Sequence, residues 1–301
     1  MKALVFGEIL WDIIEGQEYL GGAPLNFAAH FTQCGAQASI VSAVGNDNRG
    51  WRAINEITRL KIDYSAVNVL TSVPTGTVDV LLHDGEPTYT ITEKVAYDFI
   101  NPDEVIDSLR KKRFDVFYFG TLAQRSEQSR NALTKILDSI QFSHKFYDVN
   151  LRKDSYTPII IRNGLKRCSI FKLNKEEVPV ISQLLFKTSL STELFCRFIT
   201  DEFNIEIVII TAAAQGCQIY HQNMLTNIPG VPVQVADAVG AGDAFSAAFM
   251  FHYGYSKDPL EAARLANLIG SYVAGKSGPI PEYSPDLLQQ IRKFSNQPSQ
   301  H

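Results

Sequence analysis

The chain has 301 residues, of which 45% are hydrophobic and 20% charged, a balance typical of a globular protein with a large core. Its formal net charge is −4, and only Arg110 to Arg113 form a basic run, so a nucleic-acid partner is disfavoured. No apolar stretch approaches the length of a membrane span, which argues against a membrane partner. The four cysteines are widely scattered without metal-like spacing, as expected for thiols in a reducing cytosol. We therefore expect a cytoplasmic protein.

Short apolar runs alternate with helical patterns along most of the chain. Runs that are apolar on both faces predict strands over 3–9, 39–44, 115–119, 145–149, 169–173, 206–211 and 216–221. Helical patterns lie over 25–34, 51–59, 127–140, 175–186 and 193–203, and three more follow over 244–253, 259–275 and 285–294. This alternation predicts an α/β fold with a mostly parallel central sheet that helices cover on both sides.

One segment breaks the alternation. Residues 77–83 and 88–92 alternate around an Asp84-Gly85 turn, which predicts a β-hairpin. Because an isolated hairpin is marginally stable, we expect it to pair with the segment near 12–20 or with a partner subunit. The alternative is a hairpin added to the edge of the main sheet.

The run from Asp237 to Asp243, Asp-Ala-Val-Gly-Ala-Gly-Asp, follows an extended apolar segment over 231–235 and opens a helix. Glycines allow close approach of the backbone to a ligand, and a helix N-terminus offers its amides to an anion. A carboxylate beside an anion site suits a base that takes a proton from a substrate hydroxyl while amides hold a phosphoryl group. The alternative is an aspartate that only caps the helix after a glycine turn.

This run resembles the second signature of the PfkB, or ribokinase-like, family of sugar and nucleoside kinases. The first signature is matched by the segment from Gly21 to Ala29, about two hundred residues earlier. Similarity extends from about Gly7 to Pro281 and is closest to fructokinases. The phrases that carry this similarity are Pro-Thr-Gly-Thr at 74–77, Asp-Val-Asn-Leu-Arg at 148–152 and Lys-Leu-Asn-Lys-Glu-Glu at 172–177.

The resemblance implies one domain over 1–301, a three-layer ribokinase-like α/β sandwich with a mostly parallel central sheet and a small β-sheet lid. The lid would comprise about 12–20 and 73–98 and would also form a homodimer contact. The implied activity is ATP-dependent transfer of the gamma-phosphate to a hydroxyl of a neutral sugar, most closely fructose. The alternatives are a kinase of another sugar or of a nucleoside, a sugar-binding regulator that has lost catalysis, or a nucleotide-binding module that is not an enzyme.

Residue by residue, the resemblance implies a catalytic group and a sugar-binding group. The catalytic group consists of the base Asp243 with Gly240, Ala241 and Gly242, and the amides of Ala241, Gly242 and Asp243 form the anion hole. The substrate-binding group consists of Asp12, Gly21, Gly22 and Asn26. We expect Asp12 and Asn26 to lie across the pocket from Asp243. Read alone, Asp12 and Asn26 are also ordinary polar residues of a loop and a helix start.

The nucleotide and metal ions are assigned on the same basis. ATP would contact Asn174, Thr211, Ala213, Gly216 and Asn267, Mg²⁺ would be organised by Glu177, and a monovalent cation such as K⁺ would lie between Asp237 and the loop 276–282. Several alternatives stay open. Asn174 and Glu177 also have capping-box spacing, Asn267 also fits a solvent-facing position, and Arg152 fits either a phosphate or a surface salt bridge. Ala213 stands where the family pattern has glycine, which puts the nucleotide preference in question.

Overall fold

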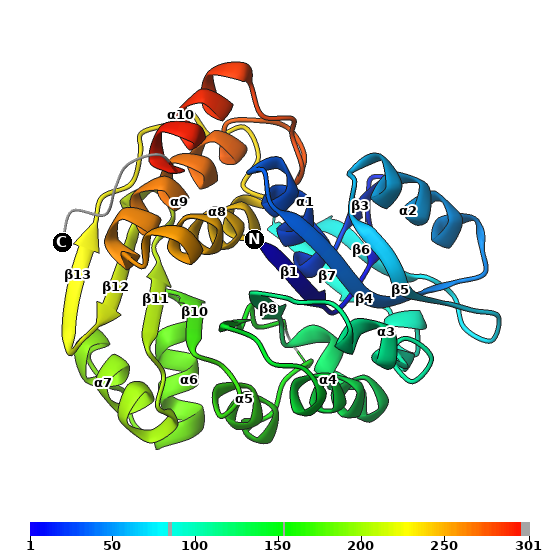
Figure 1. The fold of residues 1–301 in the computed structure, drawn as a ribbon, viewed down its shortest axis with the longest axis horizontal. Helices are drawn as coiled ribbons and strands as arrows, with labels where there is room; N and C mark the ends of the chain where they lie inside the picture. Colours follow the sequence, from blue (N-terminus) through cyan, green and yellow to red (C-terminus); the bar gives the residue numbers. More distant parts are fainter. Residues whose placement is uncertain (84–85, 153, 296–301) are drawn as a thin grey trace.

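The central element of the computed structural model, which describes residues 1–83, 86–152 and 154–295, is a nine-stranded sheet (Figure 1). In spatial order its strands are β13 (Met224–Ile228), β12 (Cys217–His221), β11 (Ile207–Thr211), β10 (Ile170–Asn174), β9 (His144–Asp148), β8 (Val116–Phe119), β1 (Lys2–Phe6), β4 (Gln37–Gly45) and β5 (Asp63–Leu70). All neighbouring pairs are parallel except those that β12 makes with β11 and β13. The prediction of a mostly parallel sheet is confirmed.

Helices cover both faces of this sheet. One layer holds α1 (Ala23–Gln33), α2 (Asn48–Arg59), α8 (Ala241–Ser256), α9 (Pro259–Ala274) and α10 (Pro285–Ser295); the other holds α3 (Ile106–Arg110), α4 (Glu127–Ser139), α5 (Pro158–Leu165), α6 (Glu177–Phe186) and α7 (Thr192–Phe203) (Figure 1). Strand β1 serves both layers: Ala3 and Val5 enter the first core, whereas Leu4 and Phe6 enter the second. This two-sided burial explains why the central strands are continuous apolar runs.

A second, four-stranded sheet has the order β3 (Gln17–Gly21), β2 (Leu10–Ile14), β6 (Gly76–His83) and β7 (Glu86–Ile91). Strand β6 pairs with β7 in antiparallel and with β2 in parallel, which sets Asp12 opposite Val78. The predicted hairpin therefore pairs with the segment near 12–20 and not with the edge of the main sheet. Its Asp84-Gly85 turn lies outside the described residues.

Two strands of the main sheet, β5 and β13, were not predicted from the sequence. Strand β5 and strand β13 carry many exposed or half-exposed residues, so neither has the apolar run that marks the central strands. The extended segment 231–235 joins neither sheet and is largely exposed. It runs beside α9, where the Ser271 hydroxyl donates to the Val231 carbonyl at 3.0 Å. Among the helices that the structure describes, none combines the length and apolarity needed to cross a membrane.

Candidate active site

The polar residues of interest gather at one edge of the main sheet. Glu8 follows β1, Asp148 and Asn174 end β9 and β10, and Thr211 ends β11. The chain passes from β1 to β4 and β5 on one side of β1 and later returns to place β8 on its other side, so the strand order reverses at β1. Such a switch point, at the carboxyl ends of parallel strands, is where open α/β sheets bind ligands.

The N-terminus of α8 reaches this edge through the glycine run. Gly240 has a φ of 79°, a left-handed conformation that favours glycine, and a Cβ there would collide with the Pro279 carbonyl. The Ala241 amide donates to the Ala238 carbonyl at 3.3 Å. Within the described part of the chain, the amides of Gly242 and Asp243 have no acceptor, and Gly242 is exposed. These two first-turn amides are therefore available to an anion, aided by the helix dipole.

Asp243 lies buried in the first turn of α8. Its Oδ2 accepts a hydrogen bond of 2.8 Å from Asn26 Nδ2. Burial, followed by the nearby charge of Asp148, raises the pKa of Asp243 to about 7, while Asn26 and Lys172 act in the opposite direction. A carboxylate with such a pKa can take a proton near neutral pH.

The expected position of Asn26 was wrong. Asn26 does not lie across the pocket from Asp243 but holds the Asp243 carboxylate directly. Helix α1 packs along α8, which brings the two side chains together. The Asn26 Oδ1 atom is buried and has no partner within the described residues, so it remains available to a ligand hydroxyl.

A buried polar cluster next to Asp243 was missed in the sequence. Asp148 accepts from Lys172 Nζ at 2.8 and 3.0 Å, from Ser246 Oγ at 2.9 Å and from Tyr118 OH at 3.3 Å. The signals were a lysine inside the apolar strand over 169–173 and a serine three residues after Asp243, on the same face of the helix.

The second sheet brings Asp12 to the same region. Burial raises the pKa of the half-buried Asp12 to about 6, and the Arg152 charge opposes this shift. A Cβ on Gly21 would collide with the Asp12 carboxylate, while Gly22 packs against the Glu8 backbone. Glu8, also missed in the sequence, is buried; desolvation raises its pKa to about 7, and its Oε2 has no partner in the part of the chain described.

Arg152 is a positively charged residue that influences several carboxyl groups of the site. It is exposed and forms no ion pair with any residue that the structure describes, so the surface salt bridge considered from sequence is absent there. Its charge nevertheless lowers the pKa values of Glu8, Asp12 and Asp243. Arg152 is therefore close enough to Glu8, Asp12 and Asp243 for its charge to act on all three carboxyl groups.

Asn174 and Glu177 form the reciprocal pair that their spacing predicted. The Glu177 amide donates to Asn174 Oδ1 at 2.9 Å, and the Asn174 amide donates to Glu177 Oε2 at 2.8 Å. Glu177 Oε1 also accepts from the Leu151 amide at 2.6 Å. The buried Glu177 carboxylate thus joins two strand ends, and each oxygen keeps a lone pair for a water of a hydrated cation. This arrangement fits an indirect role at Mg²⁺.

Asp237 contacts the loop over 276–282 directly, through a backbone amide. Its Oδ2 accepts from the Gly278 amide at 3.2 Å and its Oδ1 from the Val239 amide at 3.0 Å. No group of three or more His, Cys, Asp and Glu side chains in the described ranges forms a ready-made metal site. A metal ion bound here would therefore need ligands from backbone carbonyls, water or substrate phosphates.

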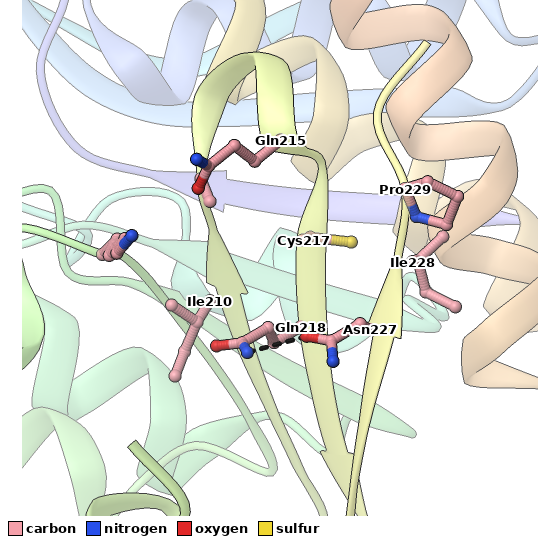
Figure 2. A pocket seen from close by; sticks show the side chains of 9 residues that line it. Ile210, Gln215, Cys217, Gln218, Asn227, Ile228 and Pro229 are labelled. Atoms are coloured by element: carbon pink, nitrogen blue, oxygen red, sulfur yellow. Dashed lines mark hydrogen bonds between the residues drawn. The ribbon is translucent and has the colours of Figure 1, made fainter. Parts of the chain in front are cut away.

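A pocket of about 330 Å³ opens beside the turn that follows β11 (Figure 2). Its lining comprises Lys175, Ile210, Ala212, Gln215, Cys217, Gln218, Asn227, Ile228 and Pro229. Gln218 Nε2 donates to Asn227 Oδ1 at 2.7 Å across β12 and β13. Neither Asp12 nor Asp243 lines this pocket.

The nucleotide residues expected from sequence surround this turn. Thr211 ends β11, and Gly216 lies where any Cβ would collide with β13 and the residues after it. Asn267 is buried rather than solvent-facing, and its Nδ2 donates to the carbonyls of Ile228 and Pro229 at 3.3 and 3.0 Å. Asn267 therefore fixes the chain where it leaves β13.

Ala213 begins the 3-10 turn η3 (Ala213–Gln215) with a φ of 46°. The left-handed conformation costs an L-residue about 1–2 kcal/mol, which glycine would avoid. Part of that gain is lost because glycine has more conformational freedom in the unfolded chain. We expect Ala213→Gly to stabilise the protein by about 0.5–1 kcal/mol, measured as a higher urea midpoint at an unchanged m-value. An unchanged or lower midpoint would show that Ala213 is not strained. The KM for ATP of the same variant tests whether the methyl group crowds the nucleotide.

Fold and site together describe an α/β protein with a buried carboxylate beside a helix N-terminus whose first-turn amides are unpaired within the described residues. The family model of the pfkB family carbohydrate kinases matches residues 4–286, so the chain belongs to this family and is a phosphotransferase with a sugar hydroxyl as acceptor. The fructokinase of Escherichia coli is 25% identical over 283 residues, which cover 89% of this chain and 90% of that protein.

Two solved structures show the same ribokinase-like fold. The fructokinase of Vibrio cholerae O395 in its fructose, ADP and calcium ion bound form matches with a TM-score of 0.83 at 20% identity, covering 96% of this chain and 98% of that one. The aminoimidazole riboside kinase of Salmonella enterica, complexed with aminoimidazole riboside and an ATP analog, matches with a TM-score of 0.81 at 19% identity, covering 97% and 99%. The predicted fold class is confirmed.

Proposed function

We propose that this protein is an ATP-dependent fructokinase. The observation that carries the proposal is Asp243, a buried carboxylate with a pKa of about 7 beside the unpaired first-turn amides of α8. A base and an anion site held this close together suit phosphoryl transfer to a hydroxyl, in which catalysis consists of positioning and charge stabilisation.

In the proposed reaction, Asp243 accepts the proton of the sugar hydroxyl as that oxygen bonds to the γ-phosphorus of ATP. The bond from the γ-phosphorus to the leaving oxygen breaks, and ADP departs. The amides of Gly242 and Asp243 hold the transferring oxygens, with Ala241 and Gly240 shaping the turn. Mg²⁺, organised by Glu177 and Asn174, would neutralise phosphate charge when bound, and a monovalent cation such as K⁺ would bind near Asp237.

ATP would follow the edge of the sheet from α8 toward the pocket of Figure 2. Thr211, Ala213 and Gly216 would line it, and Asn267 would support the base side through the chain after β13. Asp12, Gly21 and Gly22 would bind the sugar on the second sheet, which would act as a lid. Asn26 would contribute its unpaired Oδ1 to the sugar while its Nδ2 holds Asp243.

Fructose is the first choice of acceptor because relatives that match over most of this chain are named fructokinases. A phosphorylated sugar would require several cations, whereas Arg152 is a single cation shared by three carboxylates. A nucleoside is the second candidate, favoured by the similarity to an aminoimidazole riboside kinase. The third is a sugar-binding regulator with impaired catalysis, for which the strained Ala213 is the one indication.

The deciding experiment measures ADP release from ATP and Mg²⁺ with a panel of free hexoses, pentoses, sugar acids, polyols and nucleosides. The proposal requires fructose to give the highest kcat/KM. A higher value for another compound would replace fructose as acceptor. No ADP release with any panel member, combined with sugar binding by calorimetry, would favour the regulator.

We also propose a cytoplasmic homodimer formed through the second sheet. The four cysteines are all unpaired, in keeping with a reducing compartment, and Tyr19 is an exposed aromatic residue on β3. Sedimentation velocity should give a dimer that Tyr19→Glu converts to a monomer. A wild-type monomer at all concentrations would remove the idea.

A further inference from the structure

A lysine is buried inside the central sheet. Lys172 occupies the middle of β10, where its neighbours Phe171 and Leu173 are apolar and buried. It is the single lysine or arginine among the buried residues of the described chain. Lysine is almost never buried unless it is paired, and here its partner is Asp148, with Nζ 2.8 and 3.0 Å from the two carboxylate oxygens.

This ion pair lies directly beneath the first turn of α8. Ser246, three residues after Asp243, donates to Asp148 Oδ2 at 2.9 Å and so ties the helix to the pair. A Cβ on Gly242 would lie 3.7 Å from Lys172 Nζ, so the ammonium is next to the turn that offers its amides to an anion. The pair is therefore close to both the base and the anion site.

Charged groups face Asp243 from several elements. Asp148 on β9 raises the pKa of Asp243, whereas Lys172 on β10 and Arg152 after β9 lower it, and Asn26 on α1 donates a hydrogen bond. Tyr118 on β8 stays neutral, because burial and the surrounding carboxylates raise its pKa well above the usual value.

Lys172 keeps its own charge in this setting. Burial by itself lowers the pKa of Lys172, but Asp148, Asp243 and Glu177 together raise it above the usual value. A buried ion pair is a poor source of stability, since apolar residues of similar volume often serve as well. Its position beside the base points instead to a role in the reaction.

We propose that the Lys172–Asp148 pair sets the protonation state of Asp243, which makes Lys172 a positioning residue for phosphoryl transfer. The inference rests on the proposed function, in which Asp243 is the base. Lys172 favours the charged carboxylate, and Asp148 opposes it and holds Lys172 in place. Neither residue needs to touch the substrate.

The test is the acid limb of the pH profile of kcat/KM for the best acceptor, which reports the base of the free enzyme. Because Asp243 must be deprotonated, activity should fall as the pH drops through about 7. Lys172→Met removes a favourable charge, so we expect its limb to move about one pH unit higher. Asp148→Asn removes an unfavourable charge, so its limb should move lower. The double variant should return toward the wild-type position.

The opposite signs separate this role from a structural one. If both single variants lose activity while their limbs stay at the wild-type pH, the inference is wrong. If Lys172→Met does not fold, Asp148→Asn can be compared with the double variant, because these two differ only at Lys172. Acid limbs at the same pH in both would equally reject the inference. Lys112→Met is the matched control: it breaks the Lys112–Asp63 ion pair at the amino end of β5 and should not move the limb.

Asp243→Asn distinguishes this failure from failure of the proposed function. If that variant keeps its activity, Asp243 is not the base and the limb reports another group. If it is inactive but the limbs of the pair variants do not shift, only the inference about Lys172 fails.

Discussion

Asp243→Asn should lower turnover by at least about a hundredfold, which corresponds to roughly 2.7 kcal/mol of transition-state stabilisation. The amide that replaces the carboxylate cannot take the hydroxyl proton, although its oxygen can still accept the hydrogen bond from Asn26 Nδ2. Steady-state kinetics with saturating ATP and the best sugar of the panel measure the loss. Binding of the sugar, measured by calorimetry, should change little.

Folding should not suffer in this variant. The pKa of Asp243 is raised above its ordinary value, so the charged form is less favourable in the folded protein than in the unfolded chain. This penalty is absent below about pH 4, grows as the pH rises from there to about 7 and is complete above it, so the neutral amide should leave the melting temperature at neutral pH equal or higher. Asp286→Asn, an exposed aspartate on α10, is the control and should keep full activity. An Asp243→Asn enzyme with more than half of the wild-type turnover would show that another group is the base.

The layered fold could be predicted from the sequence because the patterns that mark its strands and helices are local. Strands buried on both faces, such as β1 and β11, are continuous apolar runs between helical patterns. Strand β5 could not be found in this way, since its sequence Asp-Tyr-Ser-Ala-Val-Asn-Val-Leu is partly exposed and lacks the apolar run. The pairing of β6 with β2 joins residues 66 positions apart, such as Leu10 and Gly76, and only the instability of a lone hairpin indicated it.

The site was predictable only where chemistry follows from a single segment. The glycine run placed Asp243 at a helix N-terminus correctly, because caps and glycines act locally. The contact between Asn26 and Asp243 depends on how α1 packs against α8, which no local pattern specifies, so Asn26 was misplaced. The Lys172–Asp148 pair likewise depends on adjacent strands in register.

At Ala213, by contrast, the sequence indicated a departure from the family pattern and the structure shows its effect on the backbone. The missing glycine raised a question about the nucleotide, and the left-handed φ of Ala213 gives that question a backbone cause.

Asp12→Ala should lower kcat/KM for the sugar by about one to two powers of ten, since a hydrogen bond to a charged group contributes roughly 1.5–3 kcal/mol. Asp12 is half-buried on β2, next to Gly21, and has no hydrogen-bond partner within the described residues, so its carboxylate can accept from sugar hydroxyls. The KM for ATP should stay within about twofold, because the expected nucleotide residues lie at the other end of the sheet edge, around β11.

The control for this variant is Asp79→Ala. Asp79 lies on the neighbouring strand β6 opposite Ile13, so its side chain points to the other face of the same small sheet. It should lower neither kcat/KM for the sugar nor the affinity for ATP. Equal losses in the two variants would mean that Asp12 only supports the sheet. Unaltered sugar kinetics in Asp12→Ala would move the sugar site away from β2, and the unpaired Oδ1 of Asn26 and Oε2 of Glu8 would then be the groups left to bind the acceptor.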